Sequence, residues 1–246
     1  MNEITIPIKN EEIKGFLEIP KNSQCLVIFV HGSGSSRFSK RNQDVASVLN
    51  QAGISTLLFD LLTPSEERID EYTREFRFDI SMLAKRLEVV TELILDNSIL
   101  TTSFSKIGYF GASTGAAAAL IAAANLNNPS HPNSNNSGHH EPVEGSVNIS
   151  AIVSRGGRPD LAQGYLEKVT APTLLIVGSL DTQVIELNQL AFDQLKCTKE
   201  LKIIPGATHL FEEPGKLEEV AGISAKWFNN TFYPNIAMVY PPDTYR

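Results

Sequence analysis

The sequence predicts an α/β fold in which a mostly parallel central sheet is covered by helices on both faces. Short apolar runs rich in β-branched residues alternate along the 246-residue chain with longer stretches of helical periodicity. The runs are nearly continuous in apolar character, which is typical of parallel strands buried on both sides. A strand followed by a helix, repeated several times, produces such a sheet with right-handed crossovers.

Eight segments are expected to be strands. The first two are joined without a helical stretch, so they predict an antiparallel start to the sheet, and the other six predict buried parallel strands. In chain order they are residues 4–8, 16–19, 25–30, 54–59, 106–110, 149–154, 173–177 and 201–204.

Five helices are expected, over residues 44–52, 75–96, 114–124, 183–195 and 217–228. The helix over 75–96 has the clearest pattern, because its apolar residues step by four and three and therefore share one face. Those residues are Phe76, Ile80, Leu83, Leu87, Val90 and Ile94.

The bulk composition predicts one globular domain over residues 1–246. A net charge of -7 without any Lys/Arg-rich run argues against a nucleic-acid-binding protein. The N-terminus lacks the pattern of a signal peptide, and no apolar run is long enough to span a bilayer. We therefore expect a cytoplasmic protein with two reduced cysteines, no membrane contact, and a monomeric or homodimeric state.

Two segments break the α/β pattern. Residues 125–145 are mostly Asn, Ser, Pro, His and Gly, so they bury too little apolar surface to offset the entropy of ordering, and a flexible polar loop is expected. The tail over residues 229–246 contains three Pro and three Tyr and is not expected to be helical.

The pattern G-x-S-x-G occupies residues 111–115, where a strand is expected to end and an alanine-rich helix to begin. A serine on such a sharp turn exposes its hydroxyl above the edge of the sheet, and only small residues fit two positions to either side. Gly111 and Gly115 satisfy that demand. Ser113 is therefore predicted to be a nucleophile, and a P-loop is excluded because no Gly-Lys pair follows.

A glycine-rich segment, HGSGSS, follows the expected strand 25–30 directly. An oxyanion needs two preorganised N–H donors, and we assign them to the backbone N–H groups of Ser33 and of Thr114, the residue after the nucleophile. A dinucleotide-binding fingerprint is excluded because Arg37 occupies the position of its third glycine. His31 is expected to order this loop by hydrogen bonding rather than to act as a base.

The expected base is His209, in the turn between the last strand and the last helix. The other histidines that follow Ser113 belong to the polar loop and need no function; they are His131, His139 and His140. Asp181 follows strand 173–177 and is the expected acid, although a helix N-cap is an alternative role for it. Asp60 is a second candidate acid, but it precedes the nucleophile in sequence.

In this scheme His209 removes the Ser113 proton and returns it to the leaving group, while Asp181 holds the imidazole tautomer. The motifs HGSGSSR, GASTG, LLIVGSLD and GATHLFEEPG, in this order between residues 25 and 227, resemble those of the α/β-hydrolase superfamily and, within it, the dienelactone hydrolase-like branch. The resemblance implies the same three roles and no cofactor. Dienelactone hydrolases proper use a cysteine nucleophile, whereas this chain has a serine, so hydrolysis of a small carboxylic ester or lactone is expected.

We expect an open substrate site at the carboxyl ends of the strands, without a large cap domain, because the loop after strand 149–154 is short. Arg37, Arg155 and Arg158 are expected at its rim, where a guanidinium matches a substrate carboxylate; pairing with nearby acids is the alternative. Acyl transfer or amide cleavage by the same triad is a second hypothesis for the activity, and a non-catalytic binding protein of this fold is a third.

Overall fold

The computed structural model describes residues 1–128 and 148–234. Most of the expected polar loop over 125–145, with its three histidines, and most of the expected tail over 229–246 lie outside the described residues.

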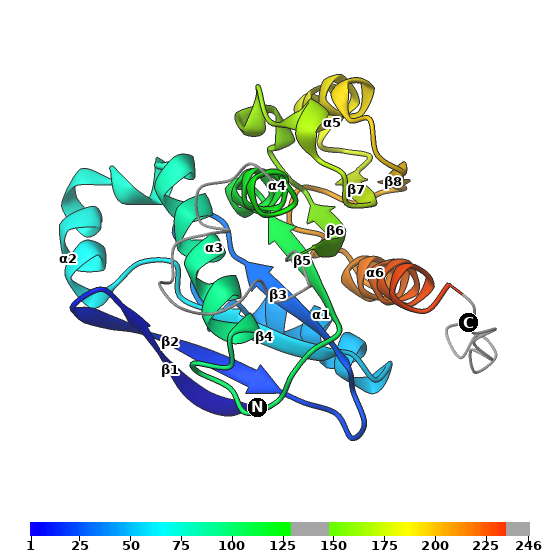
Figure 1. The fold of residues 1–246 in the computed structure, drawn as a ribbon. Helices are drawn as coiled ribbons and strands as arrows, with labels where there is room; N and C mark the ends of the chain where they lie inside the picture. Colours follow the sequence, from blue (N-terminus) through cyan, green and yellow to red (C-terminus); the bar gives the residue numbers. More distant parts are fainter. Residues whose placement is uncertain (129–147, 235–246) are drawn as a thin grey trace.

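One sheet contains all eight strands, in the order β1-β2-β4-β3-β5-β6-β7-β8 (Figure 1). β1 pairs with β2 and β2 with β4 in antiparallel fashion, and every following pair is parallel. The strands are β1 (Asn2–Ile8), β2 (Glu11–Glu18), β3 (Cys25–Val30), β4 (Ser55–Phe59), β5 (Lys106–Ala112), β6 (Ile149–Arg155), β7 (Thr173–Gly178) and β8 (Lys199–Ile204). The predicted fold class and the predicted antiparallel start are confirmed.

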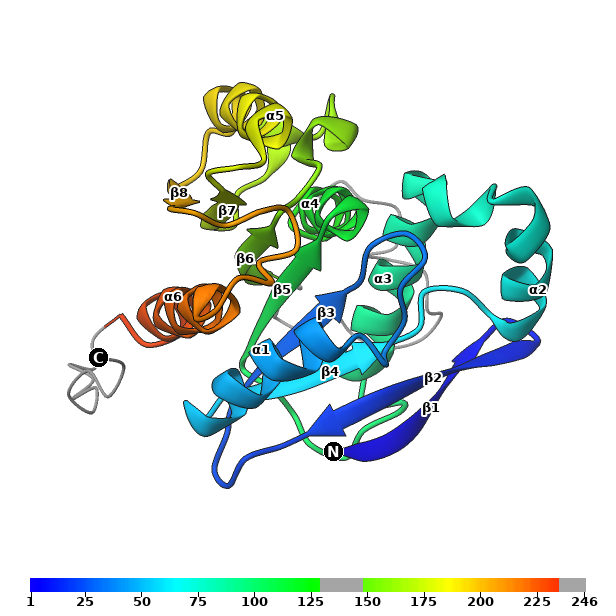
Figure 2. The same ribbon diagram turned by 180° about the vertical axis from the view of Figure 1, so that it is seen from behind.

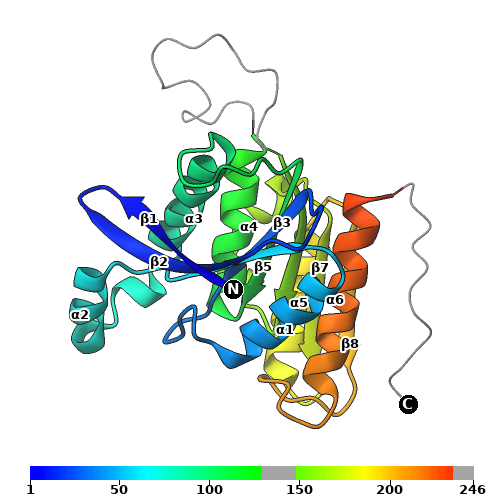
Figure 3. The ribbon, with the colours of Figure 1, turned by 90° about the horizontal axis from the view of Figure 1, so that it is seen from below.

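Helices cover both faces of this sheet. They are α1 (Lys40–Gln51), α2 (Pro64–Thr73), α3 (Ile80–Leu95), α4 (Thr114–Leu126), α5 (Thr182–Gln194) and α6 (Lys216–Phe232), with short 3-10 helices η1 (Phe76–Phe78), η3 (Pro159–Ala162) and η4 (Leu166–Lys168). α3, α4 and α5 pack on one face and α1 and α6 on the other, each with its own apolar cluster (Figures 2 and 3). In the described part of the chain, none of the helices combines the length and hydropathy that crossing a bilayer requires.

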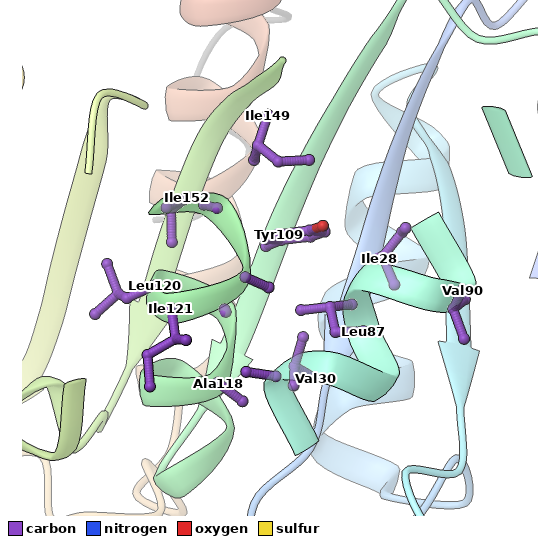
Figure 4. Close-up of a cluster of buried hydrophobic side chains, with 14 of the residues drawn as sticks. Ile28, Val30, Leu87, Val90, Tyr109, Ala118, Leu120, Ile121, Ile149 and Ile152 are labelled. Carbon is purple, nitrogen blue, oxygen red and sulfur yellow. The ribbon is translucent and has the colours of Figure 1, made fainter. Parts of the chain in front are cut away.

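On one face of the sheet, small side chains let α4 pack closely against the strands. Residues 116–124 of α4 are mostly alanine and all buried. Figure 4 shows Leu120 and Ile121 of α4 in the same cluster as Tyr109 of β5 and Leu87 of α3. The buried Tyr109 hydroxyl bonds the hydroxyl of Thr91 at 2.7 Å, so its polar atom is satisfied. This packing holds α4 against β5 and α3.

The residues that flank the expected polar loop lie at the edge of the sheet formed by the amino ends of the parallel strands. The Asn127 side chain bonds both the N–H and the C=O of Ile149, the first residue of β6. The described residues that flank the segment therefore lie at the amino end of β6. α4 runs to Leu126, two residues into the segment expected to be a loop.

The helix expected over 75–96 starts later than its apolar spacing indicates. Asp79 caps α3 with its side chain, and η1 precedes it as a separate turn. The cause is Asp70 of α2, whose carboxylate accepts the backbone N–H groups of Phe76 and Arg77 at 2.8 and 3.0 Å. These competing side-chain bonds end one helix and start the next.

α2 is a helix that apolar periodicity does not indicate, because its residues are polar and mostly exposed. Its sequence signal is a capping box. The Thr63 side chain accepts the Glu66 N–H, and the Glu66 carboxylate accepts the Thr63 N–H at 2.7 Å. Arg86 of α3 then donates two hydrogen bonds to Glu66, at 2.7 and 3.0 Å, which ties α2 to the rest of the domain.

The expectation that the tail is non-helical from residue 229 is wrong at its start, because α6 continues to Phe232. Phe228 and Phe232 are both buried and their rings stack 5.5 Å apart. They cover Gly108 of β5, where a Cβ atom would lie 2.8 Å from one ring and 3.0 Å from the other. Burial of the second ring outweighs the weak helix propensity of the Asn-Asn-Thr run between them.

Replacing Phe232 with Ala tests this packing. The ring is 3% exposed, so its loss should leave a cavity over β5 and lower the free energy of unfolding by about 3 kcal/mol. Asn230→Ala, on the exposed side of the same helix, should change it by less than about 0.5 kcal/mol. Urea denaturation measures both variants. Equal stability of the two would show that the last turn of α6 does not contribute to the core.

Candidate active site

Ser113 lies on the turn between β5 and α4 with φ 51° and ψ -123°, a left-handed conformation that is unusual for a residue with a side chain. The turn is crowded on both sides. A Cβ atom on Gly111 would lie 2.5 Å from the Ala116 Cα, and one on Gly115 would lie 2.2 Å from the Val30 carbonyl oxygen. Only glycine fits these two positions, which is the demand that the G-x-S-x-G pattern predicts.

The loop after β6 holds the backbone of the turn. The Ser113 N–H donates to the Arg155 carbonyl oxygen at 3.2 Å, and the Arg158 N–H donates to the Ser113 carbonyl oxygen at 3.0 Å. These two bonds satisfy both polar groups of the strained peptide. They also fix the position of the serine relative to β6.

Asp181 and His209 meet at the same edge of the sheet. Asp181 follows β7 and His209 follows β8, and His209 Nδ1 lies 2.6 Å from Asp181 Oδ2. Asp181 stands at the N-cap position of α5, yet its carboxylate makes no capping bond and is turned to the imidazole instead. The His209 ring lies over Gly156, where a Cβ atom would be 3.5 Å from Cε1 and Nδ1. Because Gly156 directly follows Arg155, which accepts the Ser113 N–H, His209 and Ser113 both lie against the end of β6.

The two expected oxyanion donors, the N–H groups of Ser33 and Thr114, lie next to Ser113. A Cβ atom on Gly32 would be 3.0 Å from the Ser113 Cβ, so the loop after β3 lies against the serine. The Thr114 N–H begins α4 and has no intrahelical acceptor. The Ser33 N–H, in contrast, donates to the Thr114 side-chain oxygen at 2.8 Å. In this structure the Ser33 donor is therefore already engaged.

His31 holds this loop in place, as its sequence position predicts. Its Nε2 accepts the Leu61 N–H at 3.1 Å, so the ring proton is on Nδ1, which lies 3.0 Å from the Gly32 carbonyl oxygen. Burial is the main reason that the pKa of His31 is lowered from its ordinary value. The neutral ring therefore connects the segment after β4 to the loop over residues 31–36, which is called the oxyanion loop below because it carries an expected oxyanion donor.

A cavity of about 430 Å³ opens beside the oxyanion loop. Residues 31–36 line one side, and α2 with η1 lines the other through Glu67, Asp70, Glu71 and Arg77. Arg77 pairs with Asp70. Within the described part of the chain, neither Glu67 nor Glu71 forms an ion pair. The uncompensated charges of the cavity are therefore two carboxylates one helical turn apart, which the sequence analysis did not single out. Ser113, Asp181 and His209 are not among the residues that line this cavity, and residues 32 and 33 connect it to the Ser113 turn.

Two of the three arginines expected to bind a substrate carboxylate are paired with acids. Arg37 pairs with Asp60, the second candidate acid, and its guanidinium lies 4.3 Å from the centre of the Phe38 ring. Arg158 donates two bonds to Asp160, at 2.9 and 2.7 Å. Both follow the alternative of pairing with nearby acids.

Arg155 has a different environment. It is 7% exposed, it donates to Asn42 of α1 at 3.2 Å, and no carboxylate among the described residues pairs with it. Burial and, second, the charge of Arg41 lower the pKa of its guanidinium to about 10. It does not line the cavity beside the oxyanion loop. The guanidinium therefore lies on the α1 face of the sheet.

Residues 1–128 and 148–234 contain no group of three or more His, Cys, Asp and Glu side chains that could hold a metal ion. The Asp181 carboxylate and the His209 imidazole are in direct contact, whereas the described residues show no hydrogen bond between the Ser113 hydroxyl and His209. An imidazole held by a carboxylate can accept a proton from a hydroxyl that comes within reach.

Comparison with known proteins gives one family match and several close relatives. The family model described as "Serine hydrolase (FSH1)" matches residues 63–206. Two Mycobacterium tuberculosis proteins, from strains CDC 1551 and H37Rv, are both named "Putative phosphoribosyl transferase" and are 48% identical over 231 residues. The match covers 90% of this chain and 46% of each relative, so the chain spans about half the length of these curated relatives.

Several solved structures have the same fold. The dienelactone hydrolase from Anabaena variabilis is 47% identical, with a TM-score of 0.80 over 94% of this chain and 97% of that chain. Est1E from Butyrivibrio proteoclasticus is 16% identical, with a TM-score of 0.72 over 94% and 99% of the two chains. The Pyrococcus furiosus esterase Pf2001 is 18% identical, with a TM-score of 0.68 over 94% and 91%. The last two identities are low, so these similarities concern the fold alone.

The role of His31 predicts a pH effect. Its pKa is lowered in the folded chain and is about 6.5 in the unfolded one, so the unfolded state gains the proton first as the pH falls through about 6.5. Stability contributed by the neutral ring is therefore present above about pH 6.5 and is lost below it. His31→Phe leaves the Leu61 N–H unpaired and should cost about 1–3 kcal/mol at pH 8. Urea denaturation from about pH 8 to about pH 5 should show this difference narrowing; a constant difference contradicts the assignment.

Proposed function

The chain belongs to the serine hydrolase (FSH1) family and to the dienelactone hydrolase-like branch of the α/β-hydrolases, and on this basis we propose that it hydrolyses small carboxylic esters or lactones through an acyl-enzyme. The observation that carries the proposal is the 2.6 Å contact between Asp181 and His209 beside the strained Ser113 turn. In this proposal Ser113 is the nucleophile, His209 the base and Asp181 the acid that orients it.

The proposed reaction has two halves. His209 Nε2 takes the Ser113 hydroxyl proton while Oγ attacks the ester carbonyl, and the negative oxygen of the tetrahedral intermediate is stabilised by backbone N–H donors of the oxyanion site. His209 then gives the proton to the departing alcohol, and the acyl group stays on Ser113. Water attacks the acyl-enzyme with the same base, which releases the carboxylic acid and restores the serine.

Backbone geometry supports catalysis over a purely binding role. A left-handed serine is a strained conformation that the surroundings must hold in place, and here two glycines and two backbone hydrogen bonds do so. A binding protein needs neither the strain nor a carboxylate turned to an imidazole. Acyl transfer and amide cleavage use the same three groups, and product analysis with and without an added alcohol or amine separates them from hydrolysis.

The name of the mycobacterial relatives refers to phosphoribosyl transfer, and we assign that activity to the half of those proteins that this chain does not match. A phosphoribosyl donor carries a diphosphate. The uncompensated charges of the cavity, on Glu67 and Glu71, would repel such a group. The cavity favours a small ester without negative charge.

A fluorophosphonate probe tests the proposed nucleophile, because it labels only an activated serine. We expect the wild-type chain to be labelled and Ser113→Ala to be unlabelled, with kcat for p-nitrophenyl esters lower by several orders of magnitude. Ser103→Ala, an exposed serine outside the site, should behave as wild type. Unlabelled wild-type protein, or equal labelling of the Ser113 variant, would falsify the proposal.

Charge selectivity tests the proposed substrate class. The probes are p-nitrophenyl esters whose acyl chains end in a trimethylammonium, an isosteric tert-butyl or a carboxylate group. Two exposed carboxylates should raise kcat/KM for the cationic ester about two- to tenfold over the neutral one and lower it for the anionic ester, less so at high salt. The double variant Glu67→Gln and Glu71→Gln should remove the preference, and Glu75→Gln, outside the cavity, should keep it. A wild-type preference for the anionic ester would contradict this assignment and favour binding of a substrate carboxylate by Arg37, Arg155 or Arg158.

A further inference from the structure

The side chain of Thr114 lies beside both of the expected oxyanion donors. Thr114 directly follows Ser113, is 7% exposed, and begins α4, whose first N–H is one of the expected donors. Its Oγ1 accepts the N–H of Ser33, the other expected donor, at 2.8 Å. One hydroxyl oxygen therefore lies between two expected donors that are 81 residues apart in sequence.

The Thr114 hydroxyl has a hydrogen to donate. A threonine hydroxyl is both a donor and an acceptor, and here its oxygen accepts from Ser33. No group among the described residues accepts its hydrogen. A hydroxyl whose oxygen already accepts an N–H bond is polarised and becomes a better donor, so the two bonds strengthen each other. A buried donor of this kind, without an acceptor of its own, is well suited to a charge that appears only during the reaction.

We propose that the Thr114 hydroxyl is a donor of the oxyanion hole beside the backbone N–H of Thr114, and that it takes the place of the Ser33 N–H, whose hydrogen its oxygen accepts. The inference rests on the proposed esterase function. When Ser113 attacks and the carbonyl oxygen becomes negative, the Thr114 hydroxyl turns its hydrogen to that oxygen. No proton leaves Oγ1 at any step, so the hydroxyl acts through hydrogen bonding alone. The Ser33 N–H then acts through the Thr114 oxygen, which it polarises.

The opposite role would be a competing acceptor. If the Thr114 oxygen only occupied the Ser33 N–H in the resting protein, the substrate would have to displace it, and removing the hydroxyl would speed the reaction. Thr114→Val separates the two roles, because valine keeps the branched shape and removes the hydroxyl. Thr114→Ser keeps the hydroxyl and removes the methyl group, so it reports on packing.

The experiment measures kcat and KM for a neutral p-nitrophenyl ester, and the Ki of an alkyl boronic acid, which forms a tetrahedral adduct with an active serine. We expect Thr114→Val to lower kcat about ten- to hundredfold with KM within about twofold, since loss of one oxyanion donor has effects of this order or larger. Boronic acid affinity should fall by a similar factor. Thr114→Ser should stay within about threefold of wild type, and Thr73→Val, at the far end of α2, should match wild type.

Three outcomes overturn the inference. They are a Thr114→Val variant as fast as wild type or faster, equal impairment of the Val and Ser variants, and a fall in kcat without a fall in boronic acid affinity. Thermal melting of each variant shows whether it is folded. If Thr114→Val does not fold, the activity of Thr114→Ser still tests the role of the hydroxyl, because this variant keeps the hydroxyl and loses only the methyl group. Failure of the proposed function looks different, because the wild-type chain would then neither hydrolyse esters nor react with a fluorophosphonate.

Discussion

The candidate site depends on one constraint, the strained turn that presents Ser113 at the end of β5. A left-handed backbone costs a residue with a side chain roughly 1–2 kcal/mol, and it persists only where the surroundings allow no alternative. Here the alanine-rich α4 packs so closely on the sheet that Gly111 and Gly115 have no room for a Cβ atom. Relaxing the turn would drive the start of α4 into β3 and β5. The tight packing of α4 on the sheet is therefore also what keeps the serine in its strained conformation.

Parallel strands explain why Asp181 and His209 lie at the edge of the sheet that carries Ser113. β5, β6, β7 and β8 are neighbours in the sheet and run in one direction, so the turns at their carboxyl ends share an edge. The turns after β7 and β8 pack backbone against backbone. A Cβ atom on Gly178 would lie 2.3 Å from the Ala207 carbonyl oxygen. Asp181 and His209 are therefore carried by two turns that cannot shift independently, which keeps their contact short without requiring a buried salt bridge.

The parts of the fold and of the candidate site that the sequence predicts are those with local signals. Buried strands show as continuous apolar runs, the nucleophile turn shows as two glycines around a serine, and the order of Ser113, Asp181 and His209 follows from strand ends. Features that depend on distant partners could not be predicted in this way. The end of α6 is one such feature, because Phe232 packs on Gly108 of β5. α2 has a local signal in its capping box but no apolar stripe, and its attachment to the domain depends on the distant Arg86. The arginines are a further case. Arg37 pairs with Asp60, which is distant in sequence, so only the three-dimensional structure shows that the charge of the guanidinium is compensated.

The oxyanion loop shows how much of the proposed chemistry is arranged before a substrate arrives. His31 joins the loop to the segment after β4, and the Ser33 N–H joins it to α4 through Thr114. Residues 31 and 33 of the loop are thus attached to different parts of the rigid core. Donors held in this way need little reorganisation when negative charge develops on the substrate oxygen, whereas water would have to reorient around it. Such donors interact weakly with an uncharged ester and strongly with the anionic intermediate, and that difference, rather than tight binding of the ester, is what lowers the barrier.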